Sequence, residues 1–269
     1  MERARRIGVY GVCRDGDRVL LRQVDGVWEL PGGDLGQGEH PVRAAERLVS
    51  GEVVRLRDAL ADVHRGPRWE VHRDRLIFDM RAGHGDWVPV ENVADLPLAS
   101  YAAAALGVPV NGVDRAEPDP GPPDPGRGQR FGAYGRVTDP AGRVLLTLIA
   151  EGYPGAGRWH LPGGGTDFGE APVAGLLREL AEETGQEGRV VGLLGVSSAH
   201  NPMALGPEGH PVDWHAVQVH YEVVVDRPSS PVVTEEFGGS TARAAWFDRA
   251  ELTRLPLTGV AAAVLTGGS

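Results

Sequence analysis

Alternating apolar positions along the chain predict short strands joined by tight turns. Two segments, YGVCRDGDRVLL from Tyr10 and YGRVTDPAGRVLL from Tyr134, place apolar residues on both sides of Asp-Gly or Pro-Ala-Gly turn residues, and each predicts a β-hairpin. The opening residues, MERARRIGVYGV, lack the long apolar core of a secretory signal and are more typical of a strand. The alternation in WHAVQVHY predicts a half-buried strand from Trp214, fed by a long loop over residues 200–213.

A helix is predicted shortly after the second hairpin. Its buried stripe repeats at i, i+3, i+4 and i+7 and consists of Val173, Leu176, Leu177 and Leu180. Pro172 suits the first turn of this helix and Gly185 suits its C-terminal cap. The sequence therefore predicts a helix between these two residues.

The same segments occur in the same order in both halves of the chain. Trp28 matches Trp159, Pro31 matches Pro162 and Glu39 matches Glu170, each pair separated by the same number of residues. Later, WVPVENVADLPL matches WFDRAELTRLPL. Residues 111–129 between the halves are dense in Pro and Gly and predict an extended linker. We therefore expect one domain at residues 1–110 and another at 130–269, each with a mixed α/β plan.

Composition and charge narrow the possible functions. Hydrophobic residues make up 41% and charged residues 24%, an ordinary balance for a globular protein without membrane spans. The single cysteine, Cys13, excludes an intramolecular disulfide and fits a cytoplasmic location. Acidic residues outnumber basic residues 37 to 27, which argues against bulk nucleic-acid binding. A phosphorylated small molecule is still compatible with this charge if divalent cations lie between the two negative partners.

In the second half of the chain, three carboxylates are the strongest candidates for a functional site. At 100° per residue, Glu179, Glu182 and Glu183 fall together on the helix flank beside the buried stripe. Such a cluster is most often a solvated charged face, and the alternative is a site for hard divalent cations. The glycines at 163–165 favour the second interpretation, because glycine lets a backbone turn tightly and approach a ligand.

The stretch from Gly164 to Gln186 resembles the Nudix box, G-x5-E-x7-R-E-U-x-E-E-x-G-U, in which U is aliphatic. The fitting positions are Gly164, Glu170, Arg178, Glu179, Leu180, Glu182, Glu183 and Gly185. Gln186 departs from the pattern at a packing position. The resemblance implies tandem α/β/α sandwiches of the Nudix fold, each with a mixed sheet between helices. It also implies hydrolysis of a nucleoside diphosphate linked to another group, such as ADP-ribose, a nucleotide sugar or a nucleoside triphosphate.

The resemblance also implies roles for individual residues. Mg²⁺, with Mn²⁺ as an alternative, is expected on Glu179, Glu182 and Glu183. Members of the family differ in their general base, so the candidates are Glu179, Glu183 and, from a later loop, Glu235 and Glu236. Gly163, Gly164 and Arg158 are expected at the substrate, although Arg158 is equally compatible with a solvated arginine. Glu170 and Arg178 are expected to brace the loop, or else to form an ordinary surface ion pair.

The first copy keeps the spacing of the box but lacks two of its three helix carboxylates. Gly33, Glu39 and Arg47 are in place, but Leu48 and Gly51 stand where Glu179 and Glu182 occur, and only Glu52 is retained. One carboxylate does not organise a magnesium site of this type. We therefore predict that the first domain is non-catalytic.

Several alternatives remain open at this point. The chain could be a sensor that binds nucleotides without cleaving them, although its second box is intact. His200, His210, His215 and His220 match no compact zinc motif. Because enzymes of this family commonly work as dimers, the two domains are expected to pair as an intramolecular pseudo-dimer, or the chain to form a homodimer.

Overall fold

The chain folds into two compact units, which are described separately. The computed structural model describes residues 2–81, 83–110, 113, 114, 116, 119–121, 124–205, 209–234 and 239–267. The first unit comprises Met1–Arg130 together with Ser198–Val217, and the second comprises Phe131–Ser197 together with Gln218–Ser269. Within the described ranges, no helix has both the length and the apolar character needed to cross a membrane.

The first unit contains a seven-stranded mixed sheet. Its elements are β1 (Glu2–Asp15), β2 (Arg18–Val24), β3 (Val27–Glu29), β4 (Gly32–Asp34), α1 (Pro41–Val49), β5 (Glu52–Arg65), β6 (Trp69–Arg81), β7 (Asp86–Pro89), a 3₁₀ helix (Val90–Asp95) and α2 (Ser100–Leu106). The strand order is β3-β2-β1-β6-β5, with β4 paired to β1 and β7 paired to β2. Strands β1 and β6 are parallel, whereas β2, β4 and β5 pair with their neighbours in antiparallel fashion.

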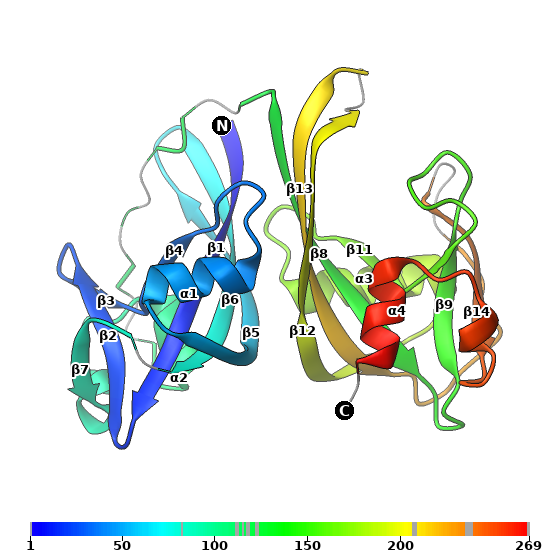
Figure 1. Ribbon diagram of the computed structural model, residues 1–269. Helices are drawn as coiled ribbons and strands as arrows, with labels where there is room; N and C mark the ends of the chain where they lie inside the picture. Colours follow the sequence, from blue (N-terminus) through cyan, green and yellow to red (C-terminus); the bar gives the residue numbers. More distant parts are fainter. Residues whose placement is uncertain are drawn as a thin grey trace. The chain divides into compact units, whose positions relative to one another are not determined.

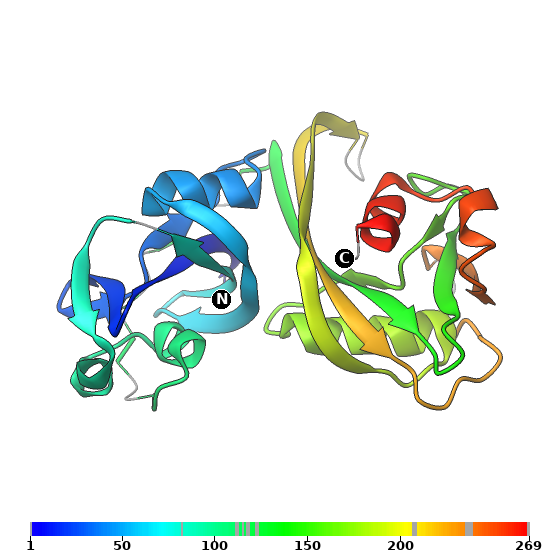
Figure 2. The same ribbon diagram turned by 60° about the horizontal axis from the view of Figure 1, so that its bottom comes forward.

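The second sheet repeats this plan strand for strand. Its elements are β8 (Arg127–Thr138), β9 (Val144–Ile149), β10 (Trp159–His160), β11 (Gly163–Gly165), α3 (Pro172–Thr184), β12 (Arg189–Leu205), β13 (Pro211–Val224), β14 (Thr241–Phe247), a 3₁₀ helix (Leu252–Arg254) and α4 (Gly259–Thr266). The order is β10-β9-β8-β13-β12, with β11 paired to β8 and β14 paired to β9. Each sheet carries its two helices on opposite faces (Figure 1, Figure 2), so the predicted sandwich fold is confirmed.

The repeated Trp and Leu-Pro-Leu segments meet in space. Trp28 forms a parallel bridge with Leu98, and Trp159 forms the same bridge with Leu257. The Trp159 N–H donates to the carbonyl of Pro256 at 2.9 Å, and its own carbonyl accepts from Thr258 at 2.9 Å. In the second unit, Trp159 also packs edge-on against the ring of Phe247 at 4.6 Å. The two motifs recur together because each sandwich uses them to attach its last helix to the sheet.

Two expectations about irregular segments need revision. Residues 200–213 were predicted as a long loop, but the described part belongs mainly to the ends of β12 and β13, because their backbones extend the strand pairing instead of leaving it. Strand β8 begins at Arg127, inside the segment predicted as linker. The proposed domain boundaries stay a prediction, and the structural units differ from them in placing Ser198–Val217 with the first unit.

Candidate active site

The glycine strand before α3 lies too close to its neighbour for any other residue. In β11, Gly163 pairs with Tyr134 of β8 and has a φ of +129°. A Cβ at Gly163 would lie 2.3 Å from the carbonyl oxygen of Ala133, which no side chain tolerates. Glycine at this position therefore lets the strand run against β8 and lead directly into the loop before α3.

Helix α3 begins and ends where the sequence predicts. Pro172 occupies its first turn, and Gly185 caps its C-terminus in the left-handed conformation with a φ of 66°. Leu176 and Leu180 of the predicted stripe are fully buried, while Val173 and Leu177 are partly buried. The buried stripe fixes the rotation of the helix, which places the glutamate flank beside β11.

Glu183 connects the end of α3 to two strands. Its carboxylate accepts a hydrogen bond from the Gly163 N–H at 2.9 Å and another from the hydroxyl of Thr241 in β14. The residue is only 3% exposed. A buried polar group is stable only with hydrogen-bond partners, so Glu183 fixes the helix, the glycine strand and β14 against one another.

Arg178 joins the remaining box residues. Its Nε and Nη2 each donate to Glu170 at 3.0 Å, and Nη2 also donates to the Gly165 carbonyl at 3.2 Å. The Nη1 atom donates to both Glu179 at 3.0 Å and Glu182 at 3.1 Å. Hydrogen bonding to Glu170, and then to Glu179, raises the pKa of Arg178 above its usual range despite partial burial. The guanidinium therefore braces the loop and also gathers two carboxylates at one point.

Glu179 lies directly against the glycine strand. A Cβ at Gly164 would come within 2.6 Å of the Glu179 carboxyl carbon. The Glu179 side chain is 15% exposed and that of Glu182 is 44% exposed. These two carboxylates consequently face the surface beside β11, whereas Glu183 is turned into the protein.

The donor set suits a hard cation only in part. Within the described ranges, no three His, Cys, Asp or Glu side chains are grouped as a preformed metal site. Glu179 and Glu182 nevertheless supply the oxygen donors that Mg²⁺ prefers, and they already converge on one cationic group. Mg²⁺ commonly uses one or two protein carboxylates together with substrate phosphates, so this pair fits a cation that binds with its substrate.

Other predicted site residues lie apart from this network or outside the description. Arg158 is exposed and donates to the Leu257 carbonyl at 3.3 Å. Glu235 and Glu236 lie outside the described residues. His200 pairs with Asp213 at 2.6 Å, and His220 binds Ser197 at 2.9 Å. Over the ranges that the structure describes, the histidines form no metal cluster.

Two contacts were not predicted from the sequence. Thr241 lies in a strand that is distant in sequence, and its hydroxyl donates a hydrogen bond to Glu183. Gln186, the one departure from the box, is 2% exposed, and its amide exchanges two hydrogen bonds of 2.9 Å with Ser229. A polar residue at an expected aliphatic position is the only sequence signal of this second contact. It ties the end of α3 to the chain between β13 and β14.

The second unit also contains a mostly apolar cavity of about 260 Å³. It lies among β8, β12, β13 and α4 and is lined by residues such as Arg136, Val196, Ser197, His220 and Val264. Burial, followed by the nearby His160, lowers the pKa of His220 to about 4. His220 is therefore neutral near pH 7, and Arg136, which is paired with Glu222, is the charged side chain of the lining.

The first unit keeps the brace and loses the acidic cluster. Arg47 donates to both oxygens of Glu39 at 2.9 and 2.7 Å, as Arg178 does to Glu170. The Leu48 side chain lies near Gly33, in the place that Glu179 takes beside Gly164. Helix α1 has 9 residues against 13 in α3 and ends before the last turn. Glu52 is therefore an exposed residue of β5 and is no longer on the helix.

A known domain family matches the second half of the chain. The model of the NUDIX domain family matches residues 127–266. Among solved structures, a MutT NUDIX hydrolase from Burkholderia pseudomallei is 28% identical, with 53% of this chain and 100% of that chain covered and a TM-score of 0.41. The NUDIX domain of Shewanella oneidensis NrtR, complexed with ADP ribose, is 21% identical, with 53% and 88% covered and a TM-score of 0.41. Because the family model spans more than half of its residues, the chain belongs to the NUDIX domain family.

Proposed function

We propose that the second unit hydrolyses a diphosphate bond in a nucleoside diphosphate derivative, with Mg²⁺ as the cofactor. The observation that carries this proposal is the convergence of Glu179 and Glu182 on Arg178 beside the glycine strand. A divalent cation, when bound there, supplies the positive charge that neutralises the diphosphate. Mn²⁺ would suit the same oxygen donors.

The proposal gives the three glutamates different tasks. Glu179 and Glu182 hold the cation and face the substrate, and Glu179, which lies against the glycine strand, is the candidate to accept a proton from the attacking water. Glu183 is a positioning residue, because its carboxylate already binds Gly163 and Thr241. Glu170 and Arg178 hold the loop in register with the helix.

The cavity between the sheet and α4 supports a substrate with an organic group. Its lining is mostly apolar, as is typical of pockets for small organic ligands. We propose that it receives the nucleoside or the second group of the substrate. ADP-ribose, nucleotide sugars and nucleoside triphosphates all remain candidates on this basis.

The proposal is tested by a screen of Mg²⁺-dependent hydrolysis. The substrates are ADP-ribose, nucleotide sugars, dinucleoside polyphosphates and nucleoside triphosphates, each assayed with and without EDTA. We expect turnover with at least one class and loss of turnover in EDTA. Saturable binding without turnover in every class would instead favour the nucleotide sensor.

Substitution of the paired carboxylates tests the site itself. We expect Glu182→Gln to lower kcat by about a hundredfold or more, because a neutral amide binds a hard cation poorly. Glu187→Gln makes the same change at an exposed position just beyond α3 and is expected to leave kcat unchanged. Near-normal turnover by a folded Glu182→Gln protein would contradict the assignment of Glu182.

We also propose that the first unit is non-catalytic and pairs with the second as an intramolecular pseudo-dimer. Leu48 and the shortened α1 support the first part, because both remove carboxylates that the second unit retains. A covalent tether supports the second part, since it raises the effective concentration of the two halves to about the millimolar range. A homodimer is the alternative, and analytical ultracentrifugation of the full chain distinguishes the two.

A further inference from the structure

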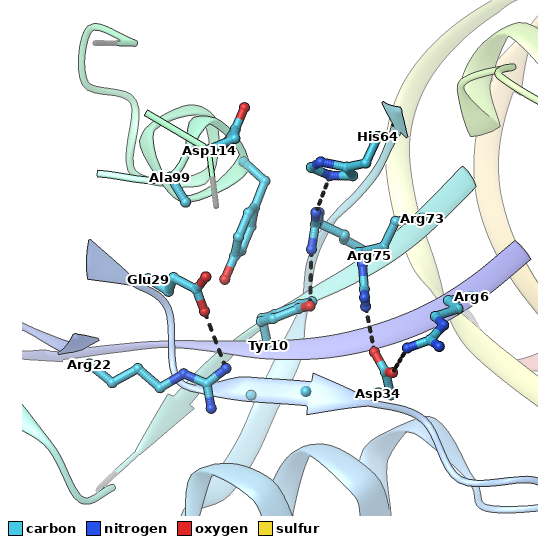
Figure 3. Close-up of a pocket in the computed structure, with 13 residues that line it drawn as sticks. Arg6, Tyr10, Arg22, Glu29, Asp34, His64, Arg73, Arg75, Ala99 and Asp114 are labelled. Atoms are coloured by element: carbon cyan, nitrogen blue, oxygen red, sulfur yellow. Dashed lines mark hydrogen bonds and ion pairs between the residues drawn. The ribbon is translucent and has the colours of Figure 1, made fainter. Parts of the chain in front are cut away.

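The first unit contains a cavity of about 280 Å³ that the proposed hydrolysis does not use. Arginines reach it from three strands: Arg6 from β1, Arg22 from β2, and Arg73 and Arg75 from β6 (Figure 3). The opposite side is formed by α2 and the chain around it, including Tyr101. A unit that has lost its acidic cluster thus keeps a cavity lined by several guanidinium groups.

Two side chains of this cavity, Asp34 and Arg22, have no counterpart of the same type in the second unit. Asp34 pairs with Gly8 in β1, and the same register in the second sheet pairs Gly165 with Gly132. The first unit therefore carries a carboxylate where the second carries no side chain.

The neighbouring hairpin shows a second replacement. Arg22 pairs with Glu29 between β2 and β3, where the second unit pairs Thr147 with His160. The first unit therefore carries an arginine at this position of its cavity, whereas the second unit carries a threonine.

Asp34 is a carboxylate of the cavity that two arginines share. Its Oδ2 accepts from Arg6 at 3.2 Å, and its Oδ1 accepts from Arg73 (Figure 3). The Asp34 side chain is 49% exposed, so it can turn into water without a large desolvation cost. If it turned away, two guanidinium groups would face the cavity.

The other carboxylates that line the cavity are held in place. Glu29 is 6% exposed and is bonded by Arg22 at 3.3 Å. Asp114 accepts from the backbone N–H and the hydroxyl of Ser100, both at 2.8 Å, at the start of α2. None of these hydrogen bonds involves Arg6 or Arg73, so Asp34 is the carboxylate that a ligand exchanges on those two arginines.

Arg75 is fixed at the back of the cavity. Its guanidinium donates to Asp62 at 2.8 Å and to the Tyr10 hydroxyl at 3.0 Å, and it stacks 4.1 Å from the centre of the Tyr101 ring. Only 4% of this side chain is exposed. Arg75 thus contributes a rigid positive wall, while Arg6, Arg22 and Arg73 are the groups that can contact a ligand.

We propose that this cavity binds a phosphorylated small molecule, without a divalent cation, by exchanging the Asp34 carboxylate for a phosphate group on Arg6 and Arg73. The proposal concerns the first unit and does not depend on hydrolysis by the second.

The charges favour this exchange. A phosphomonoester carries about −1.5 to −2 charges and three acceptor oxygens, whereas Asp34 offers a single charge and two oxygens. The planar fork of arginine matches phosphate oxygens in pairs. The cavity is larger than a phosphate group needs, so the ligand carries an organic part as well. Arginines here supply the positive charge that Mg²⁺ is proposed to supply in the second unit.

The test measures binding of ADP to the full-length chain by isothermal titration calorimetry in excess EDTA, which removes metal-dependent binding by the second unit. We expect saturable binding that inorganic pyrophosphate displaces. Arg6→Gln and Arg22→Gln are each expected to weaken it by about tenfold, the scale of one lost charged hydrogen bond. Asp34→Asn is expected to strengthen it, because the competing charge is gone.

The control is Arg55→Gln, which removes the same charge from an exposed position on β5 and is expected to leave binding unchanged. Circular dichroism checks the fold of each variant, and Asp34→Asn decides the question if an arginine variant does not fold. The proposal is overturned if millimolar ADP shows no saturable binding in EDTA, if pyrophosphate fails to compete, or if Asp34→Asn leaves the affinity unchanged. A loss of Mg²⁺-dependent turnover in the Glu182→Gln protein tests the second unit separately.

Discussion

Gly33 and Gly164 occupy the same register position of the two sheets but face different side chains. Gly33 pairs with Val9 in β1, and Gly164 pairs with Ala133 in β8. The atom nearest to a Cβ at Gly33 is a methyl group of Leu48 at 3.7 Å, an ordinary contact. At Gly164 it is the Glu179 carboxyl carbon at 2.6 Å. An added methyl group therefore fits at Gly33 but collides with Glu179 at Gly164.

The first prediction concerns this pair of glycines. We expect Gly164→Ala to lower kcat by about tenfold or more, because the Glu179 carboxylate must move away from its place beside Arg178. Gly33→Ala is the matched control and is expected to change neither turnover nor the melting temperature. Steady-state kinetics and thermal melting of both proteins check this. Equal activity of the two variants would show that the position of Glu179 is not important.

The second prediction concerns two histidines of the second unit. Burial lowers the pKa of His160 to about 4, and burial together with His160 lowers that of His220 to about 4. In the unfolded chain both would titrate near pH 6.5. Between these values the unfolded state binds more protons, so the free energy of unfolding falls as the pH drops from about 6.5 to 4, by up to about 3 kcal/mol for His220.

This prediction is measured by urea unfolding at several pH values across that window. Carboxylates with lowered pKa values, such as Asp139, lose their contribution only at lower pH, because their unfolded values are already near 4. We expect His220→Gln to show a shallower dependence on pH than the natural chain. If both proteins lose stability with the same slope, the buried neutral histidine is not its source.

At the scale of elements, the two box helices differ by one turn. Both begin with a proline in the first turn, but α1 ends at Val49 with Ser50 in the left-handed conformation, whereas α3 continues to Thr184. The missing turn is the part that carries Glu182 and Glu183 in α3. Because the Glu39–Arg47 brace is kept, the loop before α1 has retained its shape although its helix has lost the acidic cluster.

The third prediction follows from this difference. Glu52→Gln is expected to leave Mg²⁺-dependent turnover unchanged within about twofold, because Glu52 is an exposed residue of β5 and Leu48 has replaced its helix partner. Steady-state assays against the natural chain check it. A loss comparable to that of Glu182→Gln, in a folded protein, would show that the first unit contributes a working metal site.

At the scale of the whole molecule, the chain is built from one sandwich plan used twice. Strand order and the Trp–Leu bridge are the same in both units. Their extents differ, however, because the compact first unit includes Ser198–Val217 in addition to the N-terminal part of the chain. Expression of residues 127–269 alone would separate this segment from the rest of its unit.

The fourth prediction uses that fragment. We expect residues 127–269 to fold but to show faster amide hydrogen exchange over residues 198–217 than the full chain, because this segment loses its packing neighbours. A raised KM would follow if the segment also supports substrate binding. Equal protection and equal kinetics in the fragment and the full chain would exclude a supporting role for the first unit.

Features that depend on neighbouring residues were predictable from the sequence. The hairpins, the limits of α3 and the buried Leu176 and Leu180 follow from turn residues, end signals and a periodic stripe, all of which act within a few positions. The repeat was visible because it preserves residue order. The Nudix box is a local pattern on one loop and one helix, so the residues that belong to it could be predicted from the sequence alone.

Only the tertiary structure decided how the box glutamates divide. Helical periodicity places Glu179, Glu182 and Glu183 on one flank, but it does not show that Thr241 from β14 reaches Glu183 while Arg178 holds the other two. The same is true of the cavity in the first unit, where Arg6, Arg22 and Arg73 come from three separate strands. Local patterns determine the elements, whereas contacts between residues distant in sequence depend on sheet register, which no single segment encodes.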